Sequence, residues 1–382
     1  MKTAEKNLYL GEQLIHQEVS RLGPLHFERF TDLALYHPQY GYYSQTKQQR
    51  GRGGDYFTSL QVSSLFPDIF VEALIKMRES LGSDQFTLIE VGSGDGEFLG
   101  TILDRLKEKK MLGGVRAWVV EKSRVGRDRI WKRLSRYGKC EVVAELSDIE
   151  WLGTVEGCIF SNELFDALPF HRFKFQGGNF YEIVVHKAGD TLIEKVGDVL
   201  PGKLVSDLGL NLLEWEENQE GEYRSQVSAL YENWAQILSR GFVATFDYGH
   251  PRAYLYSPIR SKGTWMCYQN HKTNQEILKF IGQQDITAHV DFTQLAIEGK
   301  KQQFDPLLFC TQGIFLTHVG AEIIEEKLKK GLHPGVVQQL VHPDSMGEIF
   351  SVFIQGKEVD LPQNFKSIPN RLRRLNWPPV IR

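Results

Sequence analysis

Three carboxylates surround a glycine-rich turn in the stretch FTLIEVGSGDG, residues 86–96. Residues 87–91 are mostly β-branched or aliphatic and predict a buried strand, which ends at the glycines and leads into a helix. A dinucleotide site would read G-x-G-x-x-G and would hold a pyrophosphate at the helix N-terminus. Here Glu90, Asp95 and Glu97 disfavour a phosphate and favour a ligand with a cationic end, such as S-adenosylmethionine. A tight turn in another kind of α/β protein is the alternative.

A further acid follows at a distance that suits a nucleoside. Glu121 ends the second predicted strand, 116–120, about 25 residues beyond the glycines. A carboxylate at that position can accept hydrogen bonds from both ribose hydroxyls. Surface helices often begin beside an acid, so Glu121 indicates a cofactor site only together with the glycine turn.

Asn162, Glu163 and Asp166 follow the fourth predicted strand, 157–160. In a doubly wound sheet, residues at this point face the reactive end of a cofactor. A structural interpretation is equally open. In that interpretation Asn162 caps the next helix, Glu163 enters its first turn and Asp166 is solvated.

The order of the predicted elements indicates an α/β fold with a doubly wound, mostly parallel sheet, because strands and helices alternate after the glycine turn. Before it, up to about residue 81, the chain reads as helices around one unusual loop, 37–59, which is rich in glycine, basic and aromatic residues. Such a loop is either a connector or a lid over a site. The later predicted elements are a helix at 225–240, strands at 241–249 and 285–290, helices at 312–340 and a strand at 348–355.

The middle segment, 173–221, reads as an insertion. QGGN at 176–179 predicts a hairpin turn between two strands, and TLIEKV predicts a further short strand. The acidic segment LEWEENQEGEY, 213–223, has no periodicity and is expected to be a solvated linker. Tyr248 follows the fifth strand on the ligand side of the sheet, where it lines either an acceptor pocket or the core. His289 is expected to be a structural histidine.

Composition excludes several classes of protein. Of the 382 residues, 41% are hydrophobic and 24% are charged, which is ordinary for a globular protein with a sizeable core. A net charge of −3 argues against a nucleic-acid binder. The four cysteines are scattered, so neither a disulfide framework nor a metal site is predicted. No stretch is long enough to span a membrane and the first residues lack an apolar signal region, so we expect a cytoplasmic, bacterial protein.

Several motifs together resemble the MidA-like methyltransferases. They are the E-x-G-x-G-x-G turn, NELFDALP at 162–169 and GGDYFTS at 53–59, followed in the expected order by GFVATFDYGH, GTWMCYQNH, DITAHVDF, QGIFLTHVG and MGEIF. The resemblance implies a Rossmann-like class I fold with a seven-stranded sheet, an N-terminal helical extension and inserted hairpins. It also implies S-adenosylmethionine as cofactor and S-adenosylhomocysteine as product. The family includes the mitochondrial arginine methyltransferase that assists the assembly of respiratory complex I.

The positions above and the resemblance together assign a role to each group of residues. The predicted cofactor-binding residues are Glu90, Gly92, Gly94, Gly96, Glu121 and Asn162. The predicted catalytic residues are Glu163, followed by Asp166 and Asn162. The predicted lid and substrate-facing residues are Asp55, Phe57, Thr58, Ser59 and Tyr248. No metal ligand is assigned.

Four positions depart from the family pattern. Ser93 and Asp95 stand where members usually have Pro and Arg, Thr101 replaces an Asp, and Ile183 replaces the Arg of a Glu-Arg pair. Cofactor binding is expected to survive, because the glycines and Glu121 remain. The lost charges are expected to affect the binding of a polypeptide substrate more than the binding of the cofactor.

The leading hypothesis is a methyltransferase that acts on an arginine side chain of a protein substrate. The expected substrate is a respiratory-complex or other assembly partner. Methyl transfer is an in-line displacement, so the protein mainly aligns and desolvates donor and acceptor. Carboxylates such as Glu163 can hold a guanidinium bidentately. The alternatives are a small molecule or another side chain as acceptor, and a non-catalytic assembly factor.

Three regions are predicted along the chain. They are an N-terminal helical region with the loop at 1–81, a methyltransferase domain at 82–360 with an insertion at about 174–222, and a tail at 361–382.

Overall fold

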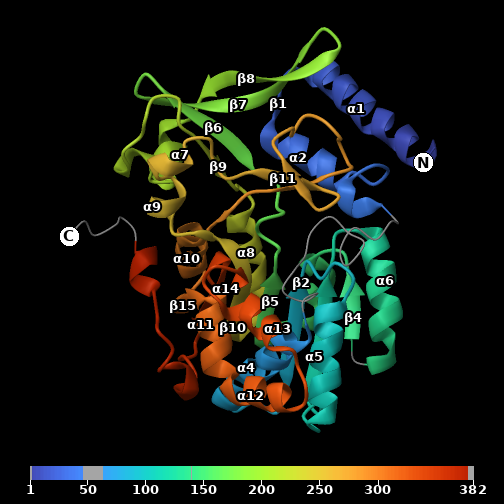
Figure 1. Cartoon of the computed structure of the whole chain (residues 1–382), viewed down its shortest axis with the longest axis vertical. Helices are drawn as coiled ribbons and strands as arrows, with labels where there is room; N and C mark the ends of the chain where they lie inside the picture. The colour runs from blue at the N-terminus through green and yellow to red at the C-terminus, as the bar shows by residue number, and fades with distance from the viewer. Residues whose placement is uncertain (1, 46–62, 139, 377–382) are drawn as a thin grey trace.

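The computed structural model describes residues 2–45, 63–138 and 140–376. Within them, two sheets dominate the arrangement, and Figure 1 shows the larger one in the lower half of the molecule, flanked by helices. The smaller sheet lies above it, beside the N-terminal helices α1 (Lys2–Leu22) and α2 (Phe27–Tyr36). Each described helix is too short or too polar to traverse a lipid bilayer.

The large sheet has eight strands among the described residues, and it is mixed but mostly parallel. Seven of them follow the order β15-β16-β10-β5-β2-β3-β4, and β14 pairs with β10. Strand β16 runs antiparallel to both of its neighbours, and the other pairs are parallel. The bounds are β2 Phe86–Val91, β3 Val115–Val120, β4 Cys140–Val143, β5 Val155–Asn162, β10 Leu238–His250, β14 Val290–Asp291, β15 Asp305–Thr311 and β16 Phe350–Lys357.

The predicted number of seven strands is therefore one short. Strand β10 is 13 residues long and pairs with β16 only as far as Tyr248. Its last two residues, Gly249 and His250, pair with the two-residue strand β14. A strand of two residues is too short to show a hydrophobic period, which explains why the sequence predicted a single strand at 285–290. It is in fact divided into β13 (Asp285–Thr287) and β14.

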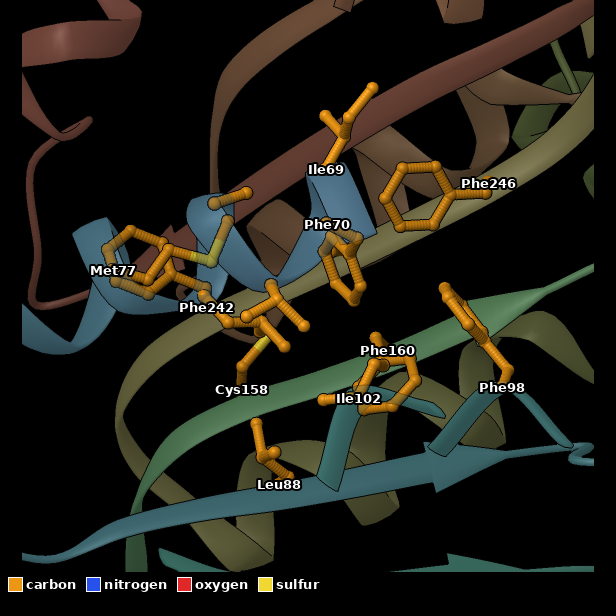
Figure 2. Close-up of a cluster of buried hydrophobic side chains, with 14 of the residues drawn as sticks. Ile69, Phe70, Met77, Leu88, Phe98, Ile102, Cys158, Phe160, Phe242 and Phe246 are labelled. Atoms are coloured by element: carbon orange, nitrogen blue, oxygen red, sulfur yellow. The ribbon is translucent and has the colours of Figure 1, made fainter. Parts of the chain in front are cut away.

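Both faces of the large sheet are covered, and successive residues of a strand point into different cores. Along β5, Cys158 and Phe160 belong to one buried cluster and Ile159 to the other. This alternation follows from the two-residue period of a strand, and a strand with a core on each face is expected to be apolar along its middle, as Cys158, Ile159 and Phe160 are. Figure 2 shows the first cluster, in which Phe70 of α4 (Leu65–Leu81) and Phe98 of α5 (Glu97–Glu108) pack against the sheet.

Helix α4 (Leu65–Leu81) belongs to the large sheet's first core although it precedes residue 82. It ends at Gly82, which takes a left-handed φ of 61° and donates its N–H to the carbonyl of Arg78. The domain limits 1–81, 82–360 and 361–382 stay predictions.

The smaller sheet follows the order β1-β7-β6-β9, with β8 paired to β7. Its first turn confirms the predicted QGGN hairpin, because Gly177 and Gly178 both have positive φ between Gln176 and Asn179. The bounds are β1 Leu25–His26, β6 His171–Gln176, β7 Asn179–Ala188, β8 Thr191–Val199 and β9 Glu220–Tyr223.

The expectation that segment 213–223 is a solvated linker is wrong at its end. Glu220 and Glu222 lie buried in β9. Glu220 accepts a 2.8 Å hydrogen bond from Arg172, and Glu222 accepts one of 3.0 Å from the backbone N–H of Thr264. Both partners come from distant segments, so the sequence of the acidic stretch alone does not reveal them.

The elements predicted from residue 225 onward occur in the predicted order, with shorter helices, and the structure adds elements that were not predicted, such as β15. The predicted helix at 225–240 ends at Ile237, where β10 takes over. The predicted helical region 312–340 is three helices, interrupted at Gly320 and Gly331. The bounds are α6 Arg124–Leu134, α7 Gly202–Asp207, α8 Val227–Ile237, α9 Arg252–Leu255, α10 Phe292–Lys301, α11 Gln312–Val319, α12 Ala321–Lys329, α13 Pro334–Val341, α14 Met346–Ile349, β11 Met266–Gln269 and β12 Lys272–Asn274.

Candidate active site

A pocket of about 440 Å³ lies at the carboxyl ends of β2, β3 and β5. This edge is where open α/β sheets bind ligands. The structure brings six of the predicted site residues to its wall: Glu90, Gly92, Gly94, Glu121, Asn162 and Glu163. Three other predicted residues, Gly96, Asp166 and Tyr248, lie close by in the fold but outside the lining.

The glycines of the turn are needed for its shape. Gly92 has a φ of 76°, and a Cβ there would lie 2.7 Å from the Cδ1 atom of Leu164. Gly94 also has a positive φ, and Gly96, with a φ of 77°, begins α5. A side chain at these positions would strain the backbone or fill the pocket. The turn therefore allows a bound group to approach the backbone.

Glu90 is a buried carboxyl at the end of β2. It accepts a 2.6 Å hydrogen bond from the hydroxyl of Ser93. Burial raises the pKa of Glu90 to about 7, and the carboxylates of Asp95 and Glu121 act in the same direction, against the Ser93 hydrogen bond. The group therefore titrates near neutrality and can adjust its charge to a ligand.

Glu121 holds two backbone segments of the pocket together. Its carboxylate accepts hydrogen bonds from the N–H of Gly94 at 3.1 Å and from the N–H of Ser123 at 2.9 Å. Ser123 in turn caps α6 by accepting from the N–H of Gly126. Glu121 thus fixes the glycine turn relative to the start of α6, at the position predicted for a ribose contact.

Glu163 directly follows Asn162, the last residue of β5, and has a strained backbone. Glu163 has a φ of 53°, which is unfavourable for a residue with a side chain and costs about 1–3 kcal/mol. Its backbone N–H bonds to the carbonyl of Phe246 at 2.9 Å, and its carboxylate accepts from the Asn162 amide at 3.3 Å. The expected helix cap at Asn162 is absent, since no helix begins there.

Asp166 and Tyr248 lie behind the pocket wall and contact each other. The Tyr248 hydroxyl donates a 2.5 Å hydrogen bond to Oδ2 of Asp166. The neighbouring Asp247 accepts from the backbone N–H of Phe165 at 2.9 Å, and its pKa is raised well above the ordinary value by burial and by the charge of Asp166. The structural interpretation, in which Asp166 is solvated, is wrong on this point, because its side chain is buried against this cluster.

Sequence reasoning missed several members of this cluster. Asp285 is buried and accepts a 2.7 Å hydrogen bond from Tyr43. Burial raises the pKa of Tyr268, and the charges of Asp166 and Asp285 raise it further. The signal was present, because Asp285 opens the motif DITAHVDF, but nothing in that motif indicates that Asp285 bonds to Tyr43.

The histidines near this cluster are neutral. Burial lowers the pKa of His289 to about 3 and that of His250 to about 4, and the charge of Arg260 acts in the same direction. This agrees with the expectation that His289 is structural, and it makes the residue a poor base.

The predicted lid residues Asp55, Phe57, Thr58 and Ser59 lie outside the described residues. Gln45, the last described residue before them, lines the pocket together with Tyr36 and Tyr43. The start of the segment that carries the predicted lid is therefore at the pocket wall.

An α/β sheet with a glycine turn and an acid at the ends of neighbouring strands defines a nucleoside-cofactor site. A family model of S-adenosyl-L-methionine-dependent methyltransferases matches residues 70–310, and the chain belongs to this family. It is therefore an enzyme that uses S-adenosylmethionine as its methyl donor, as the sequence predicted. The pocket fits that cofactor, because its turn leaves no room for a Cβ at Gly92 and its lining includes six acidic residues.

Curated relatives resemble most of the chain. The mitochondrial protein arginine methyltransferase NDUFAF7 of Danio rerio is 24% identical over 372 residues, which cover 87% of this chain and 83% of that protein. The human protein of the same name is 24% identical over 374 residues, which cover 88% of this chain and 81% of that protein.

Two crystal structures of proteins from Burkholderia thailandensis share the fold. One, bound to S-adenosyl-homocysteine, has a TM-score of 0.86 and 23% identity and covers 97% of this chain and 98% of that chain. The other, a native structure, has a TM-score of 0.84 at 23% identity and covers 95% of this chain and 96% of that chain.

Proposed function

We propose that this methyltransferase transfers the methyl group to the guanidinium of an arginine in a protein substrate. The observation that carries the proposal is a group of buried carboxyls beside the pocket, each at most 4% exposed: Glu163, Asp166, Asp247 and Asp285. The buried guanidinium of Arg224 acts electrostatically on Asp166 and Asp247, and Glu163 is the member of the group that lines the pocket. A guanidinium that enters the pocket can donate two parallel hydrogen bonds to such a carboxylate. The names of the curated relatives support the same acceptor.

The donor side of the site is assigned to the glycine turn and its acids. Gly92 and Gly94 give the cofactor access to the backbone, Glu121 accepts from its ribose hydroxyls, and Glu90 faces its cationic end. When bound, the cofactor supplies an electrophilic methyl group and carries its own leaving group. The protein's task is to exclude water and hold the two partners in line.

Glu163 is the residue we assign to the acceptor. It is the one carboxyl of the buried group that lines the pocket, and the bond from its backbone N–H to the carbonyl of Phe246 holds its strained backbone at the end of β5. It orients the guanidinium and can accept the proton that the methylated nitrogen must lose. Asp166 and Tyr248 act through their mutual hydrogen bond, as positioning residues behind it.

We also propose that the large sheet is the seven-stranded sheet of class I methyltransferases, extended by β14. The strand order and the antiparallel β16 support this assignment. A respiratory-complex or other assembly partner and a cytoplasmic location stay predictions.

Glu163→Gln tests the acceptor role. Labelled cofactor is incubated with the purified protein and a cell lysate, and peptide mass spectrometry identifies the methylated residue. We expect methylarginine from the wild type and a loss of at least about 100-fold for Glu163→Gln, with cofactor binding retained. Glu232→Gln, on the exposed surface of α8, is the matched control and should remain fully active. Methylation of another residue type, or unimpaired methylation by Glu163→Gln, would contradict the proposal.

A further inference from the structure

His26, His171 and Glu182 converge where the N-terminal segment joins the smaller sheet. Oε1 of Glu182 lies 3.0 Å from Nδ1 of His26 and 2.6 Å from Nδ1 of His171. One ligand atom from each of the three residues lies within 4.8 Å of the other two, the sole such group of three or more metal-ligand side chains in the described part of the chain. Two imidazoles and one carboxylate are a ligand set that zinc prefers in open sites.

The surroundings of His171 are those of a metal-binding histidine. Its other nitrogen, Nε2, lies 3.0 Å from Oε2 of Glu28. Glu28 is itself held, because its Oε1 accepts from the hydroxyl of Ser225 and from the amide of Gln226 at 3.2 Å. Metal-ligating histidines usually donate their second N–H to a carboxylate that is hydrogen-bonded in turn. Tyr223 stacks on the ring at a centroid distance of 4.6 Å and fixes its plane.

The group is open on one side. The side chains of His171 and Glu182 are 14% and 8% exposed, whereas that of His26 is 63% exposed. Two ligands are thus held by packing, and the third can rotate onto an ion without disturbing the core. The open side also leaves a coordination position for water, as three-ligand zinc sites have.

We propose that His26, His171 and Glu182 bind a divalent transition-metal ion of the zinc type, with Glu28 as the outer carboxylate that orients His171. His171 and Glu182 are 11 positions apart on the paired strands β6 and β7, whereas His26 lies on β1, far away in the sequence. No ligand spacing along the chain reveals the site for that reason.

The ion has a defined structural consequence. It ties β1, which leads directly into α2, to the two central strands of the smaller sheet. Tyr36 at the end of α2 and Gln226, which bonds to Glu28, both line the cofactor pocket. The bound ion therefore stabilises the part of the pocket wall that Tyr36 and Gln226 form, without taking part in methyl transfer.

The test is zinc binding by the full chain without a polyhistidine tag. Equilibrium dialysis against Zn²⁺ followed by elemental analysis should find about one tightly bound equivalent, and Zn²⁺ should raise the melting temperature. His171→Gln and Glu182→Gln should weaken the affinity by at least about tenfold. His318→Gln, at an exposed histidine of α11, is the control and should bind like the wild type.

A second variant covers the case in which His171→Gln or Glu182→Gln fails to fold. His26 is exposed, so His26→Gln should fold normally, which circular dichroism checks, and still lose affinity. Co²⁺ in place of zinc should give the visible absorption of a tetrahedral site in the wild type and in His318→Gln, and not in His26→Gln. No bound equivalent in the wild type, or equal binding by the wild type and His26→Gln, would overturn the proposal. The cluster would then be held by a proton on His171 between two carboxylates.

Discussion

The hydroxyl of Tyr43 donates a 2.7 Å hydrogen bond to Oδ1 of Asp285, a residue 242 positions away in the chain. Tyr43 lines the cofactor pocket, and Asp285 begins β13 beside the buried carboxyls. The bond therefore connects the wall of the pocket with the acidic cluster behind it. A substitution at either residue should therefore affect both the pocket wall and the acidic cluster.

Tyr43→Phe removes this hydrogen bond and leaves a buried carboxylate oxygen with one donor fewer. We expect the free energy of unfolding to fall by about 1–3 kcal/mol, which urea denaturation measures. Tyr254→Phe, at an exposed tyrosine, should change it by less than about 0.5 kcal/mol. Equal stabilities of the two variants would show that the bond contributes nothing.

Glu121→Gln should weaken cofactor binding. The backbone N–H groups of Gly94 and Ser123 lose a charged acceptor, and the predicted ribose contact is weakened as well. We expect S-adenosylhomocysteine to bind at least about tenfold more weakly in isothermal calorimetry, since charge-assisted hydrogen bonds contribute about 1.5–3 kcal/mol. Glu141→Gln, at an exposed acid of β4, keeps wild-type affinity as its control. A Glu121→Gln protein with unchanged affinity would remove Glu121 from the cofactor site.

Glu90 should make both stability and cofactor binding depend on pH. Its pKa is raised from 4.5 to about 7 in the folded protein. Between these values the folded state binds the proton more tightly than the unfolded state, so this group's contribution to stability falls as the pH rises from 4.5 to 7 and is constant above. Glu90→Gln should lack this part of the pH dependence in denaturation experiments.

The same group should act in the opposite direction on binding. Below pH 7 Glu90 is largely neutral and cannot compensate the cationic end of the cofactor, so the affinity of the wild type should rise with pH through 7. Calorimetry at several pH values checks this, with Glu90→Gln as the variant whose affinity should stay flat. A wild type with the same flat profile would exclude Glu90 from the cation site.

Gly92→Ala should damage the turn. The added Cβ would meet Leu164 at 2.7 Å, and the φ of 76° is unfavourable for alanine. We expect a loss of about 1–3 kcal/mol in unfolding free energy together with a loss of cofactor binding. Gly113→Ala, which meets no atom within 4 Å, is the matched control and should be nearly neutral. A Gly92→Ala protein that binds the cofactor normally would show that the turn can accommodate a side chain at position 92.

Most of the residues proposed to hold the donor are local in the sequence, and sequence alone could therefore place them together at one pocket. Glycines, strand and acid lie within residues 86–97, and parallel strands bring Glu121 to the same edge. The acceptor side was predictable only in part. Glu163 could be predicted because it follows a strand end. The hydrogen-bond partner of Asp166, Tyr248, comes from β10, and Asp285 comes from β13. No periodicity in the sequence indicates that these strands bring the residues together.

The errors have the same physical origin. Glu220 and Glu222 were predicted to be solvated because acidic residues usually lie at the surface. Their burial depends on hydrogen bonds from Arg172 and Thr264, which are far away in the chain. The eighth strand, β14, is two residues long and is defined by its partner, not by its own sequence.

Strand β16 lies between β10 and β15, yet it is the last strand of the described chain to be synthesised. β10 is complete at His250, and the whole of 251–349 must follow before β16 can take its place beside it. Until then, the neighbouring edges of β10 and β15 are unpaired and can join the edges of other chains. A nascent chain on the ribosome therefore carries two separate pieces of the sheet, and residues 350–357 unite them.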